Sequence, residues 1–497
     1  MSTETRLGFI GLSAGAGGYG SGGSWASKSH LPYLQSDRNA GKYKVTALQN
    51  SSKKSAETAA SKFGFTDVAC YDNAQDIANS DVDVVAVSVN VPSHYDAVMP
   101  ALKAGKDIFV EWPLARNLAD AEEMTQLARE KGVRTLVGLQ ARQNSSVVAV
   151  KKLLDSGDLG EVLGTTMHGY GLIFGAVNPK SFAYGFPREN GANLLTIPCG
   201  HAIDAMCYVL GEMDYVSATL ANRRPKFQVA DGEGKIIGED TKTAHDYVAF
   251  TGTLQKSGGV VSVIYEGGQN PSGGPGFFWQ INGTKGAVVL EGAVGHLQMY
   301  QPKVKFAKAG EEAKDLDVKW VGDDFGYAVG EAWNAFAGKG DGHVTTFEDA
   351  LLRHKMIEAI YKSNESGKRE IPPAFNALLW HGNTITISAE EYIIPGHHPL
   401  AHLAPILLLL ALDMRNYNHP KTYIFIEGPV LQTVAPLPLH TVFFVLVLVP
   451  KLHSNQAEPS LFTLISFQTV RTTDAPVLKR EQLLSQAVAL LAIPFHG

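Results

Sequence analysis

Cysteine is scarce in this sequence, with three residues (Cys70, Cys199 and Cys207) among 497. Three cysteines are too few for a disulfide framework or a four-cysteine zinc site, which fits a reducing compartment. An excess of positive charge is also missing, since the formal net charge is −6 at pH 7. We therefore expect no metal site and no direct binding to nucleic acid.

Long apolar segments are missing as well. The chain reaches a strand-like run at Leu7, which leaves no room for a signal peptide. The apolar runs Leu403–Leu412 and Val442–Val449 have about ten residues each, whereas a membrane-spanning helix needs about 20. We therefore expect a cytoplasmic protein without a membrane span.

The length and the glycine content suggest how the chain is divided. A chain of 497 residues is long enough for two domains and further material. Only four of the 50 glycines lie beyond residue 372, where leucine and proline dominate. For residues 373–497 we expect an atypical Leu/Pro-rich tail of uncertain order. It is either a weakly packed extension or an appendage that binds a membrane or a partner.

The first 140 residues alternate β-branched runs with helical stretches, the pattern of βαβ units around a parallel sheet. A helix over Asn117–Lys131 is expected because Asn117 can cap it and Gly132 follows its end. Residues 1–140 are therefore predicted to form a doubly wound α/β domain of the Rossmann type. Its clearest predicted strands are Leu7–Gly11, Tyr43–Gln49, Val82–Val89 and Lys106–Glu111.

Residues 141–372 have a different order of predicted elements, because consecutive strands follow the first helices. Helices are predicted over Ser145–Ser156, His201–Leu210 and Thr346–Ser363. Strands are predicted over Val162–Tyr170, Tyr215–Ala221, Asp246–Leu254, Gly259–Glu266, Phe277–Asn282 and Ala287–Leu290. This order favours an α+β domain with an open, mostly antiparallel sheet that carries helices on one face.

A glycine-rich segment, residues 11–23, follows the first predicted strand, and the next helix is expected to begin at Ser24-Trp25-Ala26. Backbone N–H groups in such a turn can approach the pyrophosphate of a dinucleotide. The segment is longer than a G-x-G-x-x-G turn, so the N–H groups that contact phosphate stay open. The candidate contacts are Gly11, Ser13, Ala14, Ser24 and Trp25.

The end of the second predicted strand bears on the choice of cofactor. Asn50 stands where an acidic residue binds the ribose hydroxyls in NAD-preferring domains. Ser51, Ser52, Lys53 and Lys54 follow, and their hydroxyl and ammonium groups suit a 2′-phosphate. The cofactor is therefore expected to be NADP or NAD, with Asn50 and Ser51 in its site.

Further segments carry a resemblance to a known family. They are Val91-Pro92-Ser93-His94, Glu111-Trp112-Pro113-Leu114-Ala115, Asp155–Val162, Gly283-Thr284-Lys285-Gly286 and Glu358–Ser363. In order and spacing they resemble the glucose–fructose oxidoreductase and inositol dehydrogenase family (Gfo/Idh/MocA), over roughly residues 6–372. The segments Gly11-Leu12-Ser13-Ala14, Ser24-Trp25-Ala26 and Phe109-Val110-Glu111-Trp112 are similar to the fungal branch of galactose/lactose metabolism regulatory proteins, which are co-repressors.

The resemblance implies oxidation of a carbinol by hydride transfer to a nicotinamide. Family enzymes handle the proton with a Glu-Lys-Pro lysine and with a histidine four residues after an aspartate. Here Trp112 and Ile197 replace the lysine and the aspartate, and only His201 matches. An indole N–H does not ionise near neutral pH, so it cannot act as a base. The candidate catalytic residues are His201 and Asp204. His201 is either the acid/base or a histidine that is hydrogen-bonded at the start of its helix, and Asp204 can either orient it or be a surface or capping carboxylate.

The resemblance also implies further site residues. Cofactor contacts are expected from Asn90, Pro92, His94, Glu111, Trp112 and Gln140. Substrate contacts are expected from Arg142, Tyr170 and Tyr184. His94 is expected to pack under the cofactor, and Trp112 either stacks beside the nicotinamide or is an ordinary buried aromatic residue.

Two functions fit these residues. The first is an NAD(P)-dependent oxidoreductase of a sugar, a polyol or another hydroxylated small molecule, with His201 as acid/base. The second is a catalytically silent dinucleotide-binding regulator with a protein partner, which would also be nuclear. The two replaced residues favour the regulator, whereas the hydride chemistry that the cofactor itself supplies favours the enzyme. We take the oxidoreductase as the working hypothesis and expect a homodimer, as is common in the family.

Overall fold

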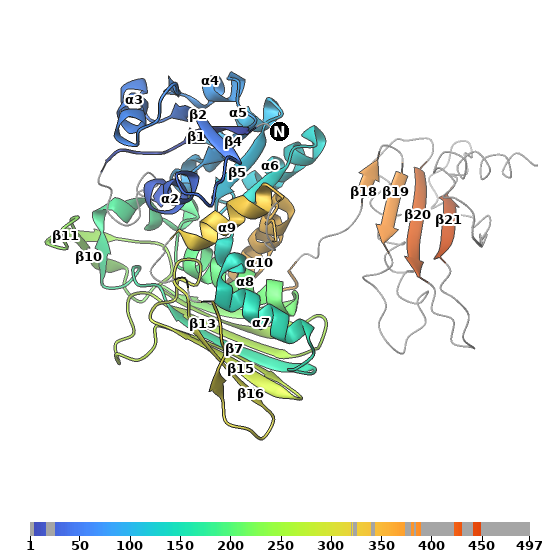
Figure 1. Cartoon of the computed structure of the whole chain (residues 1–497). Helices are drawn as coiled ribbons and strands as arrows, with labels where there is room; N and C mark the ends of the chain where they lie inside the picture. The colour runs from blue at the N-terminus through green and yellow to red at the C-terminus, as the bar shows by residue number, and fades with distance from the viewer. Residues whose placement is uncertain are drawn as a thin grey trace, which may run out of the picture. The chain divides into compact units, whose positions relative to one another are not determined.

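The computed structural model describes residues 4–15, 25–319, 321, 326–338 and 343–372, together with four strands between 379 and 448. The chain divides into two units, Met1–Ala374 and Phe375–Gly497 (Figure 1). In the second unit the four strands form one sheet. They are β18 (Leu379–His381), β19 (Thr384–Ser388), β20 (Thr422–Pro429) and β21 (Thr441–Leu448). The apolar run at 403–412 lies outside the described residues.

A six-stranded parallel sheet begins the first unit and confirms the predicted Rossmann fold. Its strands are β1 (Thr5–Ile10), β2 (Tyr43–Gln49), β3 (Ala69–Tyr71), β4 (Val84–Val87), β5 (Asp107–Glu111) and β6 (Thr135–Gly138). Every residue of β4 is buried, as expected for a strand that is covered on both faces. The spatial order is β3-β2-β1-β4-β5-β6, so successive strands are added outward on one side of β1 and then, from β4 onward, on its other side. In such sheets ligands bind outside the carboxyl ends of the strands at this point.

Helices pack on both faces of this sheet. One face carries α4 (Ala74–Asn79), α5 (His94–Lys103) and α6 (Leu118–Lys131), and the other carries α2 (Leu31–Leu34) and α3 (Lys53–Lys62). The predicted caps of α6 are present: Asn117 accepts a hydrogen bond from the Asp120 N–H, and Gly132 is left-handed at φ 63°. The second face is completed by α9 (Tyr327–Phe336), which comes from the far half of the sequence.

The second sheet has eight strands and is mixed but mostly antiparallel, which confirms the predicted open, mostly antiparallel architecture. Its order is β17-β16-β15-β14-β7-β13-β12-β9, and only the β7–β13 pair is parallel. The bounds are β7 (Val162–Tyr170), β9 (Met213–Ala221), β12 (Tyr247–Leu254), β13 (Val260–Glu266), β14 (Phe277–Gly283), β15 (Gly286–Gly292), β16 (Lys303–Lys308) and β17 (Lys314–Asp315).

Three helices lie between the two sheets of the first unit: α7 (Ser145–Asp155), α8 (Gly200–Leu210) and α10 (Phe347–Ser366) (Figure 1). The helix α10 contacts both α6 and β9, so it joins the two sheets. Its capping box confirms the predicted start, because Thr346 and Asp349 each accept a hydrogen bond from the backbone N–H of the other. This arrangement holds α8 against the carboxyl ends of the first sheet.

Several short elements carry no local pattern and were not predicted. A small sheet joins β8 (Val177–Pro179), β10 (Lys226–Ala230) and β11 (Ile236–Thr241). Every residue of β11 is exposed, so this strand has no apolar alternation to mark it. Among the described residues, no helix combines the length and the apolar character that crossing a bilayer requires.

Candidate functional site

The first candidate residue, Gly11, ends β1 with a left-handed backbone at φ 94°. Its N–H donates to the Gln49 carbonyl at 2.9 Å, and a Cβ atom here would overlap the Ser88 carbonyl oxygen. Only glycine combines this conformation with such a close approach of two backbones. The ends of β1, β2 and β4 therefore meet at Gly11, at the point where the strand order reverses.

The residues after Gly11 form a turn. The Ser13 hydroxyl accepts a hydrogen bond from the Gly15 N–H at 3.1 Å, and the Ala14 carbonyl accepts one from Lys62 Nζ at 2.6 Å. Ser24 and the glycines from 17 to 23 lie outside the described residues. Trp25 immediately precedes the π-helical turn η1 (Ala26–His30), where the predicted helix begins.

Asn50, at the position where NAD-preferring domains have an acidic residue, directly follows β2 and is buried. Its Nδ2 donates to the Leu12 carbonyl at 2.9 Å and to the Ser55 carbonyl at 3.3 Å. Asn50 therefore ties the glycine turn to the start of α3. The side chains of the residues from Ser51 to Lys54 are exposed at that helix start, and the Ser52 hydroxyl caps α3 by accepting a hydrogen bond from the Ser55 N–H at 3.2 Å.

Asn90, Pro92 and His94 follow β4. Asn90 precedes the short helix η2 (Val91–Ser93), Pro92 lies within it, and His94 begins α5. The His94 ring is buried, with Nδ1 2.8 Å from the Pro113 carbonyl oxygen and Nε2 3.1 Å from the Val89 carbonyl oxygen. Burial lowers the pKa of His94. Both ring nitrogens contact the backbone, so His94 braces the edge on which a cofactor would lie.

Trp112, at the position of the family lysine, is 4% exposed. Its Nε1–H donates to the Thr196 carbonyl at 2.6 Å, and its ring lies 5.0 Å from the ring of His354. A Cβ atom on Gly200 would lie 3.0 Å from Trp112 Nε1, so the indole packs against the start of α8. The one polar group of this side chain is therefore engaged within the protein.

Gln140 begins the short helix η3 (Gln140–Gln143) after β6 and is 1% exposed. Neither Nε2 nor Oε1 has a hydrogen-bond partner among the described residues. A buried amide without partners costs roughly 1–3 kcal/mol per unsatisfied group. A ligand that offers both a donor and an acceptor, such as the amide and hydroxyl groups of a nicotinamide nucleotide, fits this position.

His201 lies in the first turn of α8 and is 4% exposed. Its Nδ1 is buried and has no hydrogen-bond partner among the described residues. Burial, and secondarily the neighbouring His296, lowers the pKa of His201 to about 3. The imidazole is therefore neutral at physiological pH and presents an unused polar atom.

His296 follows β15 and is a neighbour of His201 that no sequence motif marked. Its Nε2 lies 2.8 Å from the Gly171 carbonyl oxygen, and its Nδ1 lies 3.1 Å from Gln298 Nε2. A carbonyl can only accept, so Nε2 carries the proton and Nδ1 accepts from the amide. Burial lowers the pKa of His296 to about 4, so this ring is neutral near pH 7 as well.

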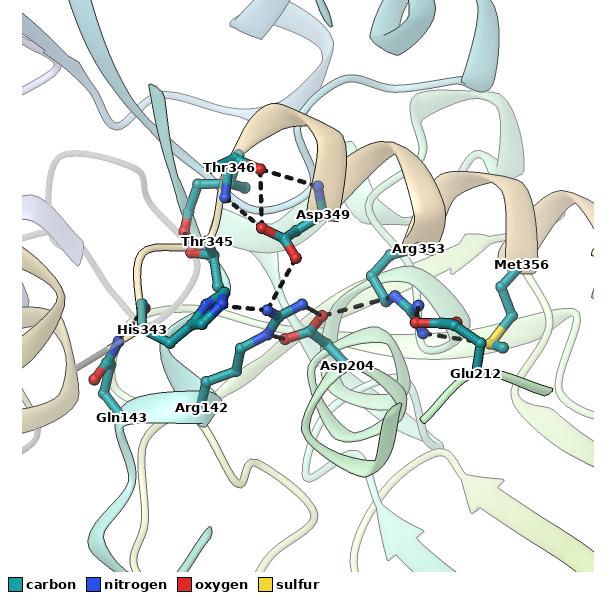
Figure 2. Close-up of polar contacts among 11 residues, drawn as sticks. Arg142, Gln143, Asp204, Glu212, His343, Thr345, Thr346, Asp349, Arg353 and Met356 are labelled. Atoms are coloured by element: carbon teal, nitrogen blue, oxygen red, sulfur yellow. Dashed lines mark hydrogen bonds and ion pairs between the residues drawn. The ribbon is translucent and has the colours of Figure 1, made fainter. Parts of the chain in front are cut away.

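Asp204 does not orient His201, and it is neither a surface nor a capping residue. Its carboxylate is completely buried and accepts two hydrogen bonds from Arg142, from Nε at 2.8 Å and from Nη2 at 2.7 Å (Figure 2). Arg353 Nε lies 3.7 Å from Asp204 Oδ1. The aspartate lies on α8 one turn after His201, but no hydrogen bond joins the two among the described residues.

Arg142, a candidate substrate residue, is occupied by the same cluster of charges. Its Nη1 donates to Asp349 Oδ1 at 3.0 Å on α10, while Arg353 also pairs with Glu212 beyond α8 (Figure 2). The guanidinium therefore fastens η3 to α8 and α10. This buried pairing, rather than a surface facing a cleft, explains why Arg142 is only 6% exposed.

The two candidate tyrosines lie apart from each other. Alternate residues of β7 face opposite sides, and Met167 is buried on the side of the helices. Tyr170 points to the other side, with its ring 4.9 Å from that of His168. Tyr170 therefore faces away from the helix-side core, which includes Met167 and the residues of α8. Tyr184 packs in the helix-side core beside Phe182, and burial raises its pKa.

The six-stranded parallel sheet and the glycine turn after β1 define a protein with an NAD-binding Rossmann fold. The profile described as the oxidoreductase family with an NAD-binding Rossmann fold matches residues 15–139. The profile described as the C-terminal domain of Gal80p matches residues 145–292. The chain belongs to the Gfo/Idh/MocA family, and its second domain is of the Gal80p type.

Relatives of this chain include both enzymes and regulators. The dehydrogenase aclE of Aspergillus oryzae is 33% identical over 375 residues, which cover 74% of this chain and 98% of the relative. The galactose/lactose metabolism regulatory protein GAL80 of Saccharomyces cerevisiae is 29% identical and covers 73% of this chain and 93% of its own length. The crystal structure of a super-repressor mutant of Gal80p from that yeast matches with a TM-score of 0.67 and 26% identity, over 74% of this chain and 98% of that one.

Proposed function

We propose that the protein is an NAD(P)-dependent oxidoreductase that oxidises a carbinol of a sugar, a polyol or a similar hydroxylated small molecule. The observation that carries this proposal is the His201 imidazole, which is neutral, buried and unpartnered at Nδ1. The dehydrogenase among the relatives supports the same reaction class. The residues that fit the dinucleotide are the turn at Gly11, Asn50 and Ser51, and the unsatisfied amide of Gln140.

In this proposal His201 handles the proton of the substrate. The nicotinamide, when bound, supplies the hydride acceptor. The neutral His201 ring accepts a hydrogen bond from the substrate hydroxyl and takes up its proton as the carbonyl forms. His296, Gln298 and the indole of Trp112 add no ionisable base near neutral pH, so His201 acts alone. A pKa of about 3 makes His201 a weak base, which predicts slow turnover.

The test uses the full-length protein with NAD or NADP and a panel of sugars and polyols, and follows the absorbance of the reduced nicotinamide. His201→Ala should lower kcat by about 10²–10⁴-fold, the usual contribution of a general base. His168→Gln is the matched control, because this histidine lies on the far side of the second sheet. Turnover that survives His201→Ala would contradict the assignment.

A second candidate function is a catalytically silent regulator that binds the dinucleotide and a protein partner. The observation that favours it is Trp112, whose indole takes the place of the family lysine and donates to the Thr196 carbonyl. The GAL80 relatives support it too. Cofactor binding without turnover on any substrate, together with cofactor-dependent capture of a partner, would favour this function over the oxidoreductase.

For the cofactor we propose a preference for NADP over NAD. The exposed hydroxyl of Ser51 and the exposed ammonium groups of Lys53 and Lys54 lie at the start of α3, where a helix favours an anion. Titration with both cofactors, followed by fluorescence, tests this. The double substitution Lys53→Ala and Lys54→Ala should weaken NADP binding more than NAD binding, and tighter binding of NAD by the unaltered protein would contradict the preference.

We also propose a homodimer that forms through the outer face of the second sheet. Leu163 and Val260 are 57% and 61% exposed there, although both are apolar strand residues. Light scattering coupled to size exclusion should give the mass of a dimer, and Leu163→Lys should shift it to the monomer. We propose a cytoplasmic location, which extends to the nucleus if the protein is a regulator.

A further inference from the structure

A chain of three buried side chains links α9 to the carboxyl end of β5. His30 Nε2 lies 2.6 Å from Glu111 Oε1, and Trp333 Nε1 donates to His30 Nδ1 at 3.1 Å. His30 and Trp333 are 1% and 0% exposed. The three residues come from η1, β5 and α9, so the tertiary fold alone assembles this contact.

The hydrogen bonds define the protonation state of the histidine. An indole N–H can only donate, so Nδ1 of His30 must present its lone pair to Trp333. The remaining ring proton is then on Nε2 and is donated to the Glu111 carboxylate. His30 is therefore a neutral donor, and the negative charge of Glu111 is kept rather than cancelled.

Among the residues that the structure describes, no lysine or arginine forms an ion pair with Glu111. The contact from His30 engages Oε1 of the carboxylate. The side chain lies over Gly138 at the end of β6, where a Cβ atom would be 2.7 Å from Oε2. Burial lowers the pKa of His201 and of His354 to about 3, so both rings are neutral, and it also lowers the pKa of His94.

The position of Glu111 in the sheet indicates what this charge meets. In a sheet of this order, β1 and β2 serve the adenosine half of a dinucleotide, and β4, β5 and β6 serve the other mononucleotide. Glu111 is the last residue of β5, and Gln140 with its unsatisfied amide follows β6. The nicotinamide half is therefore expected above a fixed, uncompensated carboxylate.

We infer that Glu111, positioned by His30 and Trp333, makes the site select the oxidised form of the nicotinamide cofactor. The oxidised ring carries a positive charge and the reduced ring carries none, so a nearby fixed anion favours the oxidised form. In a partly buried site, a unit charge a few ångströms away changes affinity by about tenfold or more. This inference rests on the dinucleotide binding in the proposed function, but not on turnover.

Such a preference also changes the redox behaviour of the bound cofactor. If the oxidised form binds tenfold more tightly than the reduced form, the potential of the bound couple falls by about 30 mV. Glu111 is here a ligand-binding residue, whereas His30 and Trp333 act through it as positioning residues.

The experiment measures the dissociation constants of the oxidised and reduced cofactors with the full chain, as NADP⁺ and NADPH and as NAD⁺ and NADH. Binding of each reduced form is followed by its fluorescence, and binding of each oxidised form by competition. The unaltered protein should prefer the oxidised form, and Glu111→Gln should reduce that preference by about tenfold, because it keeps the acceptor for His30 but removes the charge. His30→Leu should reduce it as well, whereas His30→Gln, which keeps an N–H donor, should restore most of it.

Tyr43→Phe is the matched control. It removes the bond from the Tyr43 hydroxyl to the Trp333 carbonyl, which is 3.1 Å long, but leaves the imidazole and the carboxylate untouched. It should lower stability without changing the ratio of the two constants. The inference is overturned if Glu111→Gln weakens both forms equally, or if Tyr43→Phe shifts the ratio as much as His30→Leu. Failure of the unaltered protein to bind either form of NADP or of NAD would overturn the cofactor assignment together with this inference.

Discussion

Three buried histidines predict that the protein loses stability in mild acid. Burial lowers the pKa of His201 and of His354 to about 3, and that of His296 to about 4. The hydrogen bonds also favour the neutral rings of two of these histidines. The Ala115 N–H donates to His354 Nε2 at 3.4 Å, and the Gln298 amide donates to His296 Nδ1. Protonation of either acceptor nitrogen would remove its hydrogen bond and bury a charge.

The coupling between proton binding and folding makes the free energy of unfolding fall as the pH falls. An unfolded histidine titrates near pH 6.5, so between pH 6.5 and about 4 the unfolded chain binds more protons than the folded one. The stabilisation from neutral burial is therefore complete above pH 6.5 and is lost as the pH falls. At pH 5 the loss is about 2 kcal/mol for each of the three histidines, or about 6 kcal/mol together. Ordinary domains have only about 5–15 kcal/mol of total stability, so this loss is large.

Urea unfolding at pH 7, 6 and 5, followed by tryptophan fluorescence, measures this dependence. The free energy of unfolding should fall steeply below pH 6.5, and His296→Gln should reduce the slope by about one third, because one of three groups is removed. A free energy of unfolding that is flat between pH 7 and pH 5 would refute the reasoning.

Three further predictions concern single contacts. In a urea titration, Asp204→Asn should lower the free energy of unfolding by about 3–5 kcal/mol, because it leaves Arg142 and Arg353 buried without their shared anion. The control Asp155→Asn, in an exposed pair, should lower it by less than about 0.5 kcal/mol. Gly11→Ala should abolish dinucleotide binding in a fluorescence titration, because the added methyl group meets the Ser88 carbonyl at a left-handed φ of 94°; unchanged affinity would rule out the tight turn at Gly11. Trp112→Phe should cost about 1–3 kcal/mol in thermal unfolding, because it leaves the Thr196 carbonyl unpaired, and an unchanged midpoint would show that water replaces the indole.

Much of the fold could be predicted because its signals are local. The β4 strand is apolar throughout, and the caps of α6 at Asn117 and Gly132 are adjacent to it in sequence. The boundaries were less accurate: the predicted strand 82–89 is longer than β4, because the chain turns into η2. The three-residue β3 and the fully exposed β11 lack the length or the alternation that periodicity requires.

The candidate site was predicted less completely, because its contacts join distant parts of the chain. Motifs marked His201, Glu111 and Trp112, but nothing local to the sequence indicates that His30 meets Trp333, 303 positions away. The same limit applies to Asp204. The spacing of one helical turn allows Asp204 to orient His201. The tertiary fold instead pairs its carboxylate with Arg142 and Arg353.

The replacement of the family lysine by Trp112 therefore has two physical consequences. It removes the group that would move a proton, and it removes a positive charge next to Glu111 in the sequence. With the lysine absent and the nearby histidines neutral, the carboxylate of Glu111 sets the sign of the field at the nicotinamide side of the sheet. Weak proton transfer and a preference for the oxidised cofactor then have one origin. Both the oxidoreductase and the regulator would inherit this preference, so the ratio of NAD⁺ to NADH affinity tests the charge of the site independently of turnover.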